Sequence, residues 1–380
     1  MLNWSDYECP ERMAYAAWSA IAETHSGAAR RLIRQAPTPM DALDMLGRWL
    51  DGADMPPAYR PIVERWASRV ERMNTDELVD KHLDVGGFLL TPADAAWPNQ
   101  VDDLDERSPI ALWGRGTRLD LLTGPPAVAL VGARASTAAG ERLAAQWGQE
   151  LSMRGIPIIS GGAYGIDAAA HRGALAADGG TIAVMAGGVD RLYPRGNEEL
   201  LWRIHDDGLI ISEHPPGRQP SRIRFLERNR LIAALSKVTV VVQAALRSGA
   251  LRTAREAHDL NRSVAAAPGA VTDVMHTGCN EAIRGGLATL VTRSSDIAEL
   301  AGVSGQHLGA ERQSSIPGIL DGLDEIQARV YDALPKRQAA LLPTIADIAG
   351  LTQAEVRAAL GYLHAIGMVK ATLHGYQRSR

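Results

Sequence analysis

Cysteine is scarce in this 380-residue sequence, which has only two, Cys9 and Cys279, far apart along the chain. This scarcity argues against a disulfide framework and a cysteine-rich metal site, and it favours a reducing compartment, so we expect a cytoplasmic protein. The ten histidines are scattered and form neither a His-Glu-x-x-His helix nor a Cys/His knuckle. We therefore expect no bound metal.

Long apolar runs and excess positive charge are also missing. No run approaches the roughly 18–20 residues that span a membrane, and the segment from Met1 to Glu11 lacks the basic-then-apolar layout of a signal peptide. We therefore expect no membrane partner. The formal net charge is −4. If such a chain binds nucleic acid, it must use a local basic patch.

What the sequence does contain, from Ala127 to Thr292, is a regular alternation of short apolar runs and helical patterns. Valine-rich runs such as 238–242 predict strands buried on both faces, as in a parallel sheet covered by helices. The expected strands are 127–133, 156–160, 181–186, 209–213, 238–243, 263–267 and 288–292. The expected helices are 138–153, 166–177, 196–206, 225–236, 249–260 and 279–285. The pattern predicts an α/β, doubly wound fold whose ligands bind at the carboxyl ends of the strands.

A helical domain is predicted for residues 1–82, where apolar residues repeat at helical spacing between proline and glycine breaks. It would be a small bundle like SAM or helix-hairpin-helix domains. Three roles stay open: a protein–protein module, a nucleic-acid module, or a packing cap on the next domain. Residues 83–302 form the predicted core domain, in which the segment 83–116 is expected to lie along an edge of the sheet, with Phe88-Leu89-Leu90 as a strand.

The C-terminal part begins with a predicted linker at 303–319, rich in glycine and serine. Residues 320–380 follow in the order helix, helix, helix, β-ribbon, which is typical of a winged-helix domain. Thr352 is expected to cap the third helix, with Glu355 completing a capping box. That helix begins with few basic residues, so the sequence favours a protein contact or a packing role over DNA binding.

Glycine-containing loops follow four of the predicted strands. Gly132 and Arg134 end the first strand, where a glycine permits close approach of a phosphate and an arginine can grip it. The second loop, 160–165, opens a helix whose N-terminal N–H groups attract anions. The third and fourth loops contain Ser248-Gly249 and Thr277–Asn280. All four loops would line one crevice, although each glycine alone could serve only as a tight turn.

The strongest local signal is the segment from Arg218 to Arg230, which holds five arginines, one acid and one of the two phenylalanines of the chain. Arginines that contact phosphates, together with an aromatic ring on which a base stacks, are the usual means of binding single-stranded nucleic acid. The structural alternative is a solvated helix start with Phe225 in the core. Asn229 adds a hydrogen-bonding group for a base edge or a sugar.

Enzymatic signals are weaker. Asp167 and His171 lie four residues apart on a predicted helix, which could make an acid/base pair. We favour a structural role for both, with Asp167 at the helix N-terminus and His171 packed beneath the loop. The dinucleotide fingerprint Gly-x-Gly-x-x-Gly is not met because Ser160 stands at its first glycine, and no phosphate-binding loop of the Gly-Lys-Ser/Thr kind is present. We expect no cofactor.

These residues together resemble the DNA-processing protein A family (DprA, also called Smf), over about residues 85–300. The matching stretches are Val131–Arg134, Ser160–Leu175, Tyr193-Pro194, Ser212-Glu213, Phe225–Arg230, Ser248-Gly249, Thr253-Ala254 and Pro268-Gly269. The chain departs from the family at Ala133, often serine there, and at Gln243, usually glutamate. The flanking domains also resemble those of family members, more loosely.

The resemblance implies an extended Rossmann-like core that is not an enzyme, binds single-stranded DNA, protects incoming DNA in natural transformation and loads a RecA-type recombinase. It also implies a homodimer formed through this core. Arg134 would hold a phosphate, Phe225 would stack a base, and Arg228, Asn229 and Arg230 would supply charge and polar contacts. The full set of expected DNA-binding residues is Gly132, Arg134, Gly161, Gly162, Gly165, Arg222, Arg224, Phe225, Arg228, Asn229, Arg230, Ser248, Gly249 and Asn280.

Two other functions compete with this one. The Rossmann-like layout also resembles nucleotide phosphoribohydrolases, although the Pro-Gly-Gly-x-Gly-Thr motif of those enzymes is not met at 160–165. A transcription regulator is the second alternative, with the winged-helix-like domain bound to duplex DNA and the core sensing a nucleotide. Preference for single strands over duplex would separate the first hypothesis from the regulator, and turnover of a nucleoside monophosphate would reveal the enzyme.

Overall fold

The computed structural model describes residues 9–22, 27–302, 323–335 and 338–379. They form two compact units, one within 1–309 and the other within 310–380. The predicted linker at 303–319 lies outside the described residues. In the described part of the chain, no helix combines the length and the apolar character needed to cross a membrane.

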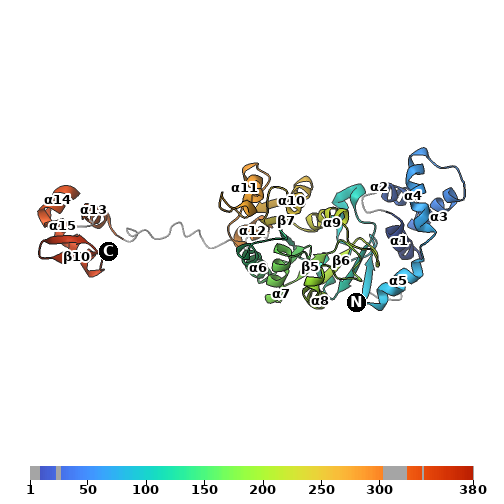
Figure 1. The fold of residues 1–380 in the computed structure, drawn as a ribbon, viewed down its shortest axis with the longest axis horizontal. Coiled ribbons are helices and arrows are strands. Elements are labelled where there is room, and N and C mark those ends of the chain that lie inside the picture. Colours follow the sequence, from blue (N-terminus) through green and yellow to red (C-terminus); the bar gives the residue numbers. More distant parts are fainter. Residues whose placement is uncertain (1–8, 23–26, 303–322, 336–337, 380) are drawn as a thin grey trace. The chain divides into compact units, whose positions relative to one another are not determined.

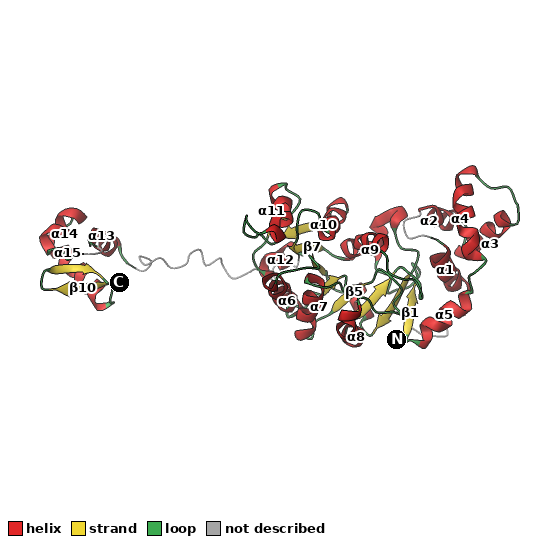
Figure 2. Cartoon of the chain, in the orientation of Figure 1, coloured by secondary structure: helices red, strands yellow, loops and turns green. Residues whose placement is uncertain are grey.

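The first unit is built on a nine-stranded sheet flanked by helices (Figures 1 and 2). Its strand order is β1-β2-β6-β5-β4-β3-β7-β8-β9. The strands are β1 (Gly87–Leu90), β2 (Leu112–Gly116), β3 (Val128–Gly132), β4 (Ile158–Ser160), β5 (Thr181–Val184), β6 (Leu209–Ser212), β7 (Val238–Gln243), β8 (Ser263–Ala266) and β9 (Thr289–Leu290). From β6 to β9 all neighbours are parallel, whereas β1 and β2 are antiparallel and form one edge.

The strand order confirms the predicted doubly wound fold. The chain adds β4, β5 and β6 on one side of β3, and then crosses over to add β7, β8 and β9 on the other side. The direction of winding reverses between β3 and β7, which is the switch point where doubly wound sheets bind their ligands. The candidate site is therefore expected at the carboxyl ends of these two strands.

Helices cover both faces of the sheet because successive strand residues point to opposite sides. The helices of the first unit after β3 are α6 (Ala138–Ser152), α7 (Ile166–Ala176), α8 (Glu198–Asp207), α9 (Arg222–Leu235), α10 (Gly249–Asp259), α11 (Thr277–Arg284) and α12 (Ser294–Leu300). Val128 and Leu130 of β3 pack with α6, α7 and α12, whereas Ala129 and Val131 pack with α9, α10 and α11. The apolar runs of the sequence are thus buried on both sides, as predicted.

The described N-terminal residues form five α-helices, of which the first and the last pack against the edge of this sheet (Figure 1). They are α1 (Pro10–Ile21), α2 (Gly27–Gln35), α3 (Pro39–Leu50), α4 (Arg60–Val70) and α5 (Thr75–Asp84). Ala16 of α1 and Val79 of α5 share an apolar cluster with Leu89 and Trp113 of the edge strands. The Trp113 indole N–H donates to Ser19 Oγ at 3.1 Å. This geometry supports the packing-cap role among the three roles left open.

The second unit contains α13 (Glu325–Ala333), α14 (Leu342–Ala349), α15 (Gln353–Ala365) and the hairpin of β10 (Val369–Thr372) and β11 (Gly375–Arg378). The predicted capping box of α15 is present, since the Thr352 N–H donates to Glu355 Oε2 at 2.8 Å and Thr352 Oγ1 accepts the Glu355 N–H. Gly350 ends α14 in the left-handed region, with φ +62°. The elements have the predicted order, and the winged-helix assignment stays a prediction.

Three elements differ from the sequence expectations. Helix α12, Ser294–Leu300, forms where the sequence predicts no element. The sequence predicts only extended chain where β2 forms, and this strand inserts between β1 and β6. Helix α9 begins at Arg222 rather than 225, because Ser221 caps it by accepting the Arg224 N–H at 3.3 Å. Arg222 and Arg224 therefore project from the first turn of a helix.

Helix α9 is fixed to the sheet by a buried ion pair. The Arg230 guanidinium donates two hydrogen bonds of 2.6 Å to the carboxylate of Glu213, which directly follows β6. Its Nε donates to the Arg107 carbonyl at 2.9 Å. The side chains are only 4% and 2% exposed. Burial alone would lower the pKa of Arg230, but the charge of Glu213 and its hydrogen bonds raise that pKa above its usual value.

We expect Glu213→Ala to lower the free energy of unfolding of the first unit by about 3–5 kcal/mol, because Arg230 would be left buried without its anion. Denaturant unfolding followed by tryptophan fluorescence measures this, since every tryptophan of the chain belongs to the first unit. The exposed pair of Glu281 with Arg284 supplies a matched control, because Glu281→Ala removes an anion that water already solvates. Equal unfolding midpoints for the two variants would contradict the anchoring role of Glu213.

Candidate nucleic-acid binding site

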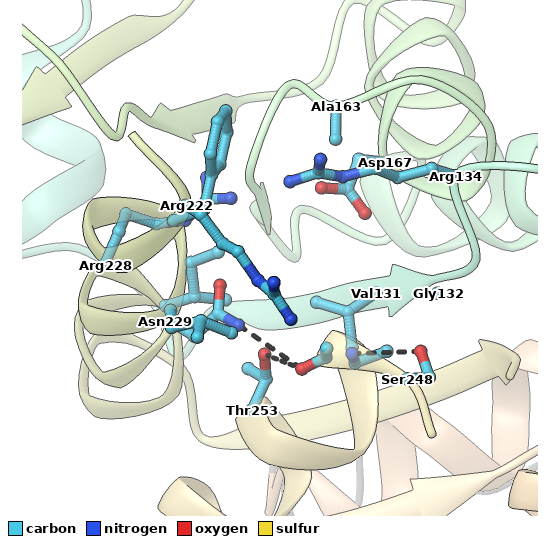
Figure 3. A pocket seen from close by; sticks show the side chains of 15 residues that line it. Val131, Gly132, Arg134, Ala163, Asp167, Arg222, Arg228, Asn229, Ser248 and Thr253 are labelled. Atoms are coloured by element: carbon cyan, nitrogen blue, oxygen red, sulfur yellow. Dashed lines mark hydrogen bonds between the residues drawn. The ribbon is translucent and has the colours of Figure 1, made fainter. Parts of the chain in front are cut away.

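A cavity of about 460 Å³ opens at the switch point, between the ends of β3 and β7 and the first turns of α9. Figure 3 shows Arg134 and Asp167 on one side of it, and Arg228 and Asn229 of α9 on the other. The lining residues are Val131, Gly132, Arg134, Ala163, Asp167, Arg222, Phe225, Leu226, Arg228, Asn229, Ile232, Ser248, Gly249, Ala250 and Thr253. The fold thus brings together segments that are more than a hundred residues apart in sequence.

Many of the predicted site residues meet in this cavity. Those that line it are Gly132, Arg134, Arg222, Phe225, Arg228, Asn229, Ser248 and Gly249. They come from three different loops or helices, which share only their position at the carboxyl ends of the parallel strands. Three of the four predicted loops contribute to the lining, whereas the fourth, Thr277–Asn280, does not, so the convergence expected from the strand pattern is present only in part.

Two arginines lie close to the Phe225 ring. The Arg134 guanidinium carbon is 4.4 Å from the centre of the Phe225 ring, and that of Arg228 is 5.9 Å away. A cation this close to an aromatic face is attracted by the ring quadrupole. The ring is partly exposed and also contacts Tyr193, at 5.8 Å between ring centres. Phe225 therefore belongs to the cavity wall rather than to the fully buried core.

Arg228 is a buried cation. It is 3% exposed, donates from Nη1 to the Val184 carbonyl, and has no hydrogen-bond partner at Nε. Burial lowers the pKa of Arg228 to about 10, against the raising effect of Asp167. The side chain is still protonated at neutral pH. A positive charge that is largely removed from water attracts a bound anion more strongly than a solvated one does.

Asp167 is the acidic counterpart of this cation. It is 7% exposed, and its Oδ2 accepts the Gly161 N–H at 3.2 Å. Burial raises the pKa of Asp167, while the charge of Arg228 acts in the opposite direction. His171 hydrogen-bonds through Nδ1 to Thr181 Oγ1 at 2.7 Å. The two side chains thus have separate partners, which supports the structural roles favoured from the sequence.

The wall of the cavity formed by Asn229 and the start of α10 is stabilised by hydrogen bonds (Figure 3). Asn229 Nδ2 donates to the Gly249 carbonyl at 3.3 Å, and Thr253 Oγ1 donates to the same carbonyl at 3.4 Å. Ser248 caps α10 by accepting the Ala250 N–H at 3.2 Å. In this state Asn229 positions the loop after β7, which is a different use from the expected contact with a base or sugar.

The three glycines of the second loop lie next to the cavity but do not line it. A side chain at Gly161 would collide with the Arg228 guanidinium, so the glycine allows the arginine to lie against the backbone. Gly162 and Gly165 have φ angles of +64° and +77°, which favour glycine. A side chain at Gly165 would also meet the carbonyls of Ala133 and Arg134. These glycines shape the loop around the site.

Three other predicted residues are placed elsewhere. Arg230 is used by its buried ion pair with Glu213. Asn280 forms reciprocal hydrogen bonds of 3.1 Å with the backbone N–H and carbonyl of Gly269, which brace the loop after β8. Arg224 lines a second cavity on the other side of α9.

Sequence reasoning missed some of the lining. Ala163 and Ile232 carry no chemical signal of their own, and Asp167 was considered only as a catalytic or capping group. The position of Asp167, directly after a glycine loop and two residues into a helix, was a usable signal for a buried charge partner. Among the described residues, no cluster of His, Cys, Asp or Glu is arranged to hold a metal ion. The cavity combines cations, one aromatic ring and one buried acid.

Comparison with known proteins gives a consistent result. The model of the family described as DNA recombination-mediator protein A matches residues 88–302, which include the whole cavity. A putative DNA processing protein DprA from Mycobacterium tuberculosis is 41% identical over 373 residues, which is 95% of this chain and 92% of that protein.

Two solved structures are similar. DNA processing protein A from Streptococcus pneumoniae has a TM-score of 0.62 at 31% identity, over 75% of this chain and 95% of its own. DNA processing protein A from Helicobacter pylori, whose structure is described in terms of its single-stranded DNA binding mode, has a TM-score of 0.51 at 30% identity, over 56% of this chain and 94% of its own.

Acid should destabilise the fold partly through His171. Burial, followed by the charges of Arg228 and Arg172, lowers the pKa of His171 to about 3, whereas an unfolded histidine titrates near 6.5. As pH falls below about 6.5 the unfolded state therefore binds the proton first, and the free energy of unfolding should fall by about 3 kcal/mol by pH 4. Denaturant unfolding at several pH values measures this. His171→Gln should show a shallower fall, and an unchanged one would refute the assignment.

Proposed function

The chain belongs to the DNA recombination-mediator protein A family, and from this premise we propose that it binds single-stranded DNA in the cavity at the switch point. It does so as a binding protein rather than an enzyme. The observation that carries the proposal is the position of Arg134 and Arg228 beside the partly exposed ring of Phe225, with Arg222 in the wall of the same cavity. Phosphate-binding cations beside a stacking surface are what a single strand requires.

In this proposal each of the lining residues contacts a different part of the DNA strand or supports such a contact. Arg134 and Arg222 are exposed and contact phosphates, while Arg228 supplies a fixed charge from beneath. Phe225 offers one face to a base. A base in a duplex is already stacked and paired, so a ring at the wall of a cavity favours an unpaired strand. A side chain at Gly132 would collide with Ile166 and the Gln243 carbonyl, so this glycine lets α7 and β7 pack at the end of β3 beside the cavity.

The wider role follows from the family. We propose that the protein acts in natural transformation and recombination, where it protects incoming single strands and loads a RecA-type recombinase onto them. We also propose that it works as a homodimer through the Rossmann-like core. A recombinase-loading assay on single strands coated with a single-strand binding protein tests the mediator role, and sedimentation tests the dimer.

We expect Phe225→Ala to weaken binding to labelled oligo-dT by roughly 1–3 kcal/mol, because a stacked base loses its aromatic surface. Fluorescence-anisotropy titration measures the loss. Trp202→Ala is the matched control, because Trp202 is an exposed aromatic residue of α8 that does not line the cavity. Unchanged affinity of Phe225→Ala, with the fold intact, would remove stacking from the proposal.

Arg134→Ala and Arg222→Ala should each reduce the salt dependence of binding. Each phosphate contact to a single strand contributes roughly 0.7 to the slope of log affinity against log salt concentration. Titrations of each variant at several salt concentrations give the slope, with Arg203→Ala, an exposed cation of α8 outside the cavity, as the control. A slope equal to that of the wild-type chain would show that the substituted arginine makes no phosphate contact.

The same titrations with matched duplex test the regulator alternative. Tight duplex binding by the full chain and weak binding to the single strand would overturn the proposed function. Release of a base from a nucleoside monophosphate would instead establish the enzyme alternative.

A further inference from the structure

A second cavity, of about 300 Å³, lies on the other side of α9. Its lining comes from the N-terminal helices and from the core together. Ser19, Ala22 and Arg69 belong to the N-terminal part, whereas His214, Arg218 and Arg224 belong to the core. Its volume is at the lower end of the range for small-ligand sites, roughly 300–1,000 Å³. The site at the switch point does not use this cavity.

The two cavities share one wall, which is the first turn of α9. Arg222 and Phe225 line the first cavity, whereas Ile223 and Arg224 line the second. This alternation follows from helix geometry, because each residue is rotated by about 100° around the helix axis, so that residues two apart lie on nearly opposite sides. A strand that leaves the first cavity on this side meets the N-terminus of α9, whose N–H groups and dipole favour an anion.

The second cavity is basic. Arg218, Arg224 and Arg69 line it, together with one acid, Glu227. Two of these arginines are oriented by the end of α1, since Arg218 Nη2 donates to the Ala20 carbonyl at 2.6 Å and Arg69 Nη1 donates to the Ile21 carbonyl at 2.8 Å. The N-terminal helices therefore position the charges of this cavity, and α4 contributes one of them.

An unsatisfied polar group provides an independent sign of a ligand. His214 lines the second cavity, is 5% exposed and has no hydrogen-bond partner at Nε2. Buried polar atoms of folded proteins are nearly always hydrogen-bonded, and exceptions need an explanation. Burial lowers the pKa of His214 to about 4, so the ring is neutral at pH 7 and can offer Nε2 as a donor or an acceptor.

We propose that the second cavity holds a further nucleotide of the same single strand, which crosses the N-terminus of α9 between the two cavities. The inference rests on the proposed function. Arg224 contacts the phosphate, and His214 hydrogen-bonds to the nucleotide. The N-terminal helices then extend the DNA path by holding Arg69 and Arg218, in addition to packing on the core.

The test is a titration of the full chain with an oligo-dT series of about 4 to 16 nucleotides. Arg224→Ala should weaken binding of the longer oligonucleotides about tenfold, which is the cost of one charged hydrogen bond, and should leave the shortest that binds unaffected. Its salt slope should fall by roughly 0.7 for the longer strands only. Arg134→Ala should weaken binding at every length.

His214 supplies a second variant pair. His214→Phe keeps a ring but removes the polar atoms, and it should weaken binding of long strands only. His214→Gln keeps hydrogen-bonding groups and should recover part of the loss. Arg203→Ala is the control, and thermal unfolding of each variant separates lost binding from lost stability.

The outcomes distinguish this inference from the proposed function. If the wild-type chain does not bind single strands, the proposed function fails. If it binds them and Arg134→Ala weakens binding, but Arg224→Ala has no effect or an equal effect at all lengths, only the second cavity is refuted. Tight binding of free dTMP that depends on Arg224, with no length dependence, would likewise overturn the strand path.

Discussion

The ion pair between Arg230 and Glu213 is the constraint on which the candidate site depends. It joins the middle of α9 to the end of β6, with both side chains almost completely buried. Two parallel hydrogen bonds fix the orientation of an arginine more strictly than a single contact does. Because the pair sets the rotation of α9, it determines that Arg228 points toward the switch point and Arg224 away from it.

This orientation of α9 places Arg228 in the cavity at the switch point. The glycine loop at the end of β4 leaves room for the Arg228 guanidinium, and the start of α10 closes the opposite side. The cost of burying Arg228 is reduced by Asp167 and by the Val184 carbonyl. A bound phosphate would reduce that cost further, so the charge contributes to affinity without the loss of side-chain entropy that a solvated arginine suffers on binding.

Strand identity was predictable from sequence, because valine-rich runs of this kind are typical of strands buried on both faces. The convergence of the first three loops was predictable too, whereas the fourth, Thr277–Asn280, does not line the cavity. The placement of Arg134, Phe225 and Arg228 at one cavity also agrees with the sequence, and their binding roles stay predictions. The direction of individual arginines was not predictable. Arg228 and Arg230 differ by only two positions, yet one faces the cavity and the other pairs with Glu213, a distant residue that no local pattern connects to it. The start of α9 could have been found from Pro220-Ser221, because serine is a common N-cap of helices.

The N-terminal helices show why a domain boundary in sequence need not be a boundary in function. Residues 1–82 have helical periodicity of their own, yet α1 packs on the edge strands and its last carbonyls orient Arg69 and Arg218. A helix C-terminus carries partial negative charge and stabilises cations beside it. The positive charge that these arginines present beside α9 therefore depends on how α1 is docked. Any change that loosens the packing of α1 would disperse this charge, even where the core sheet stays intact.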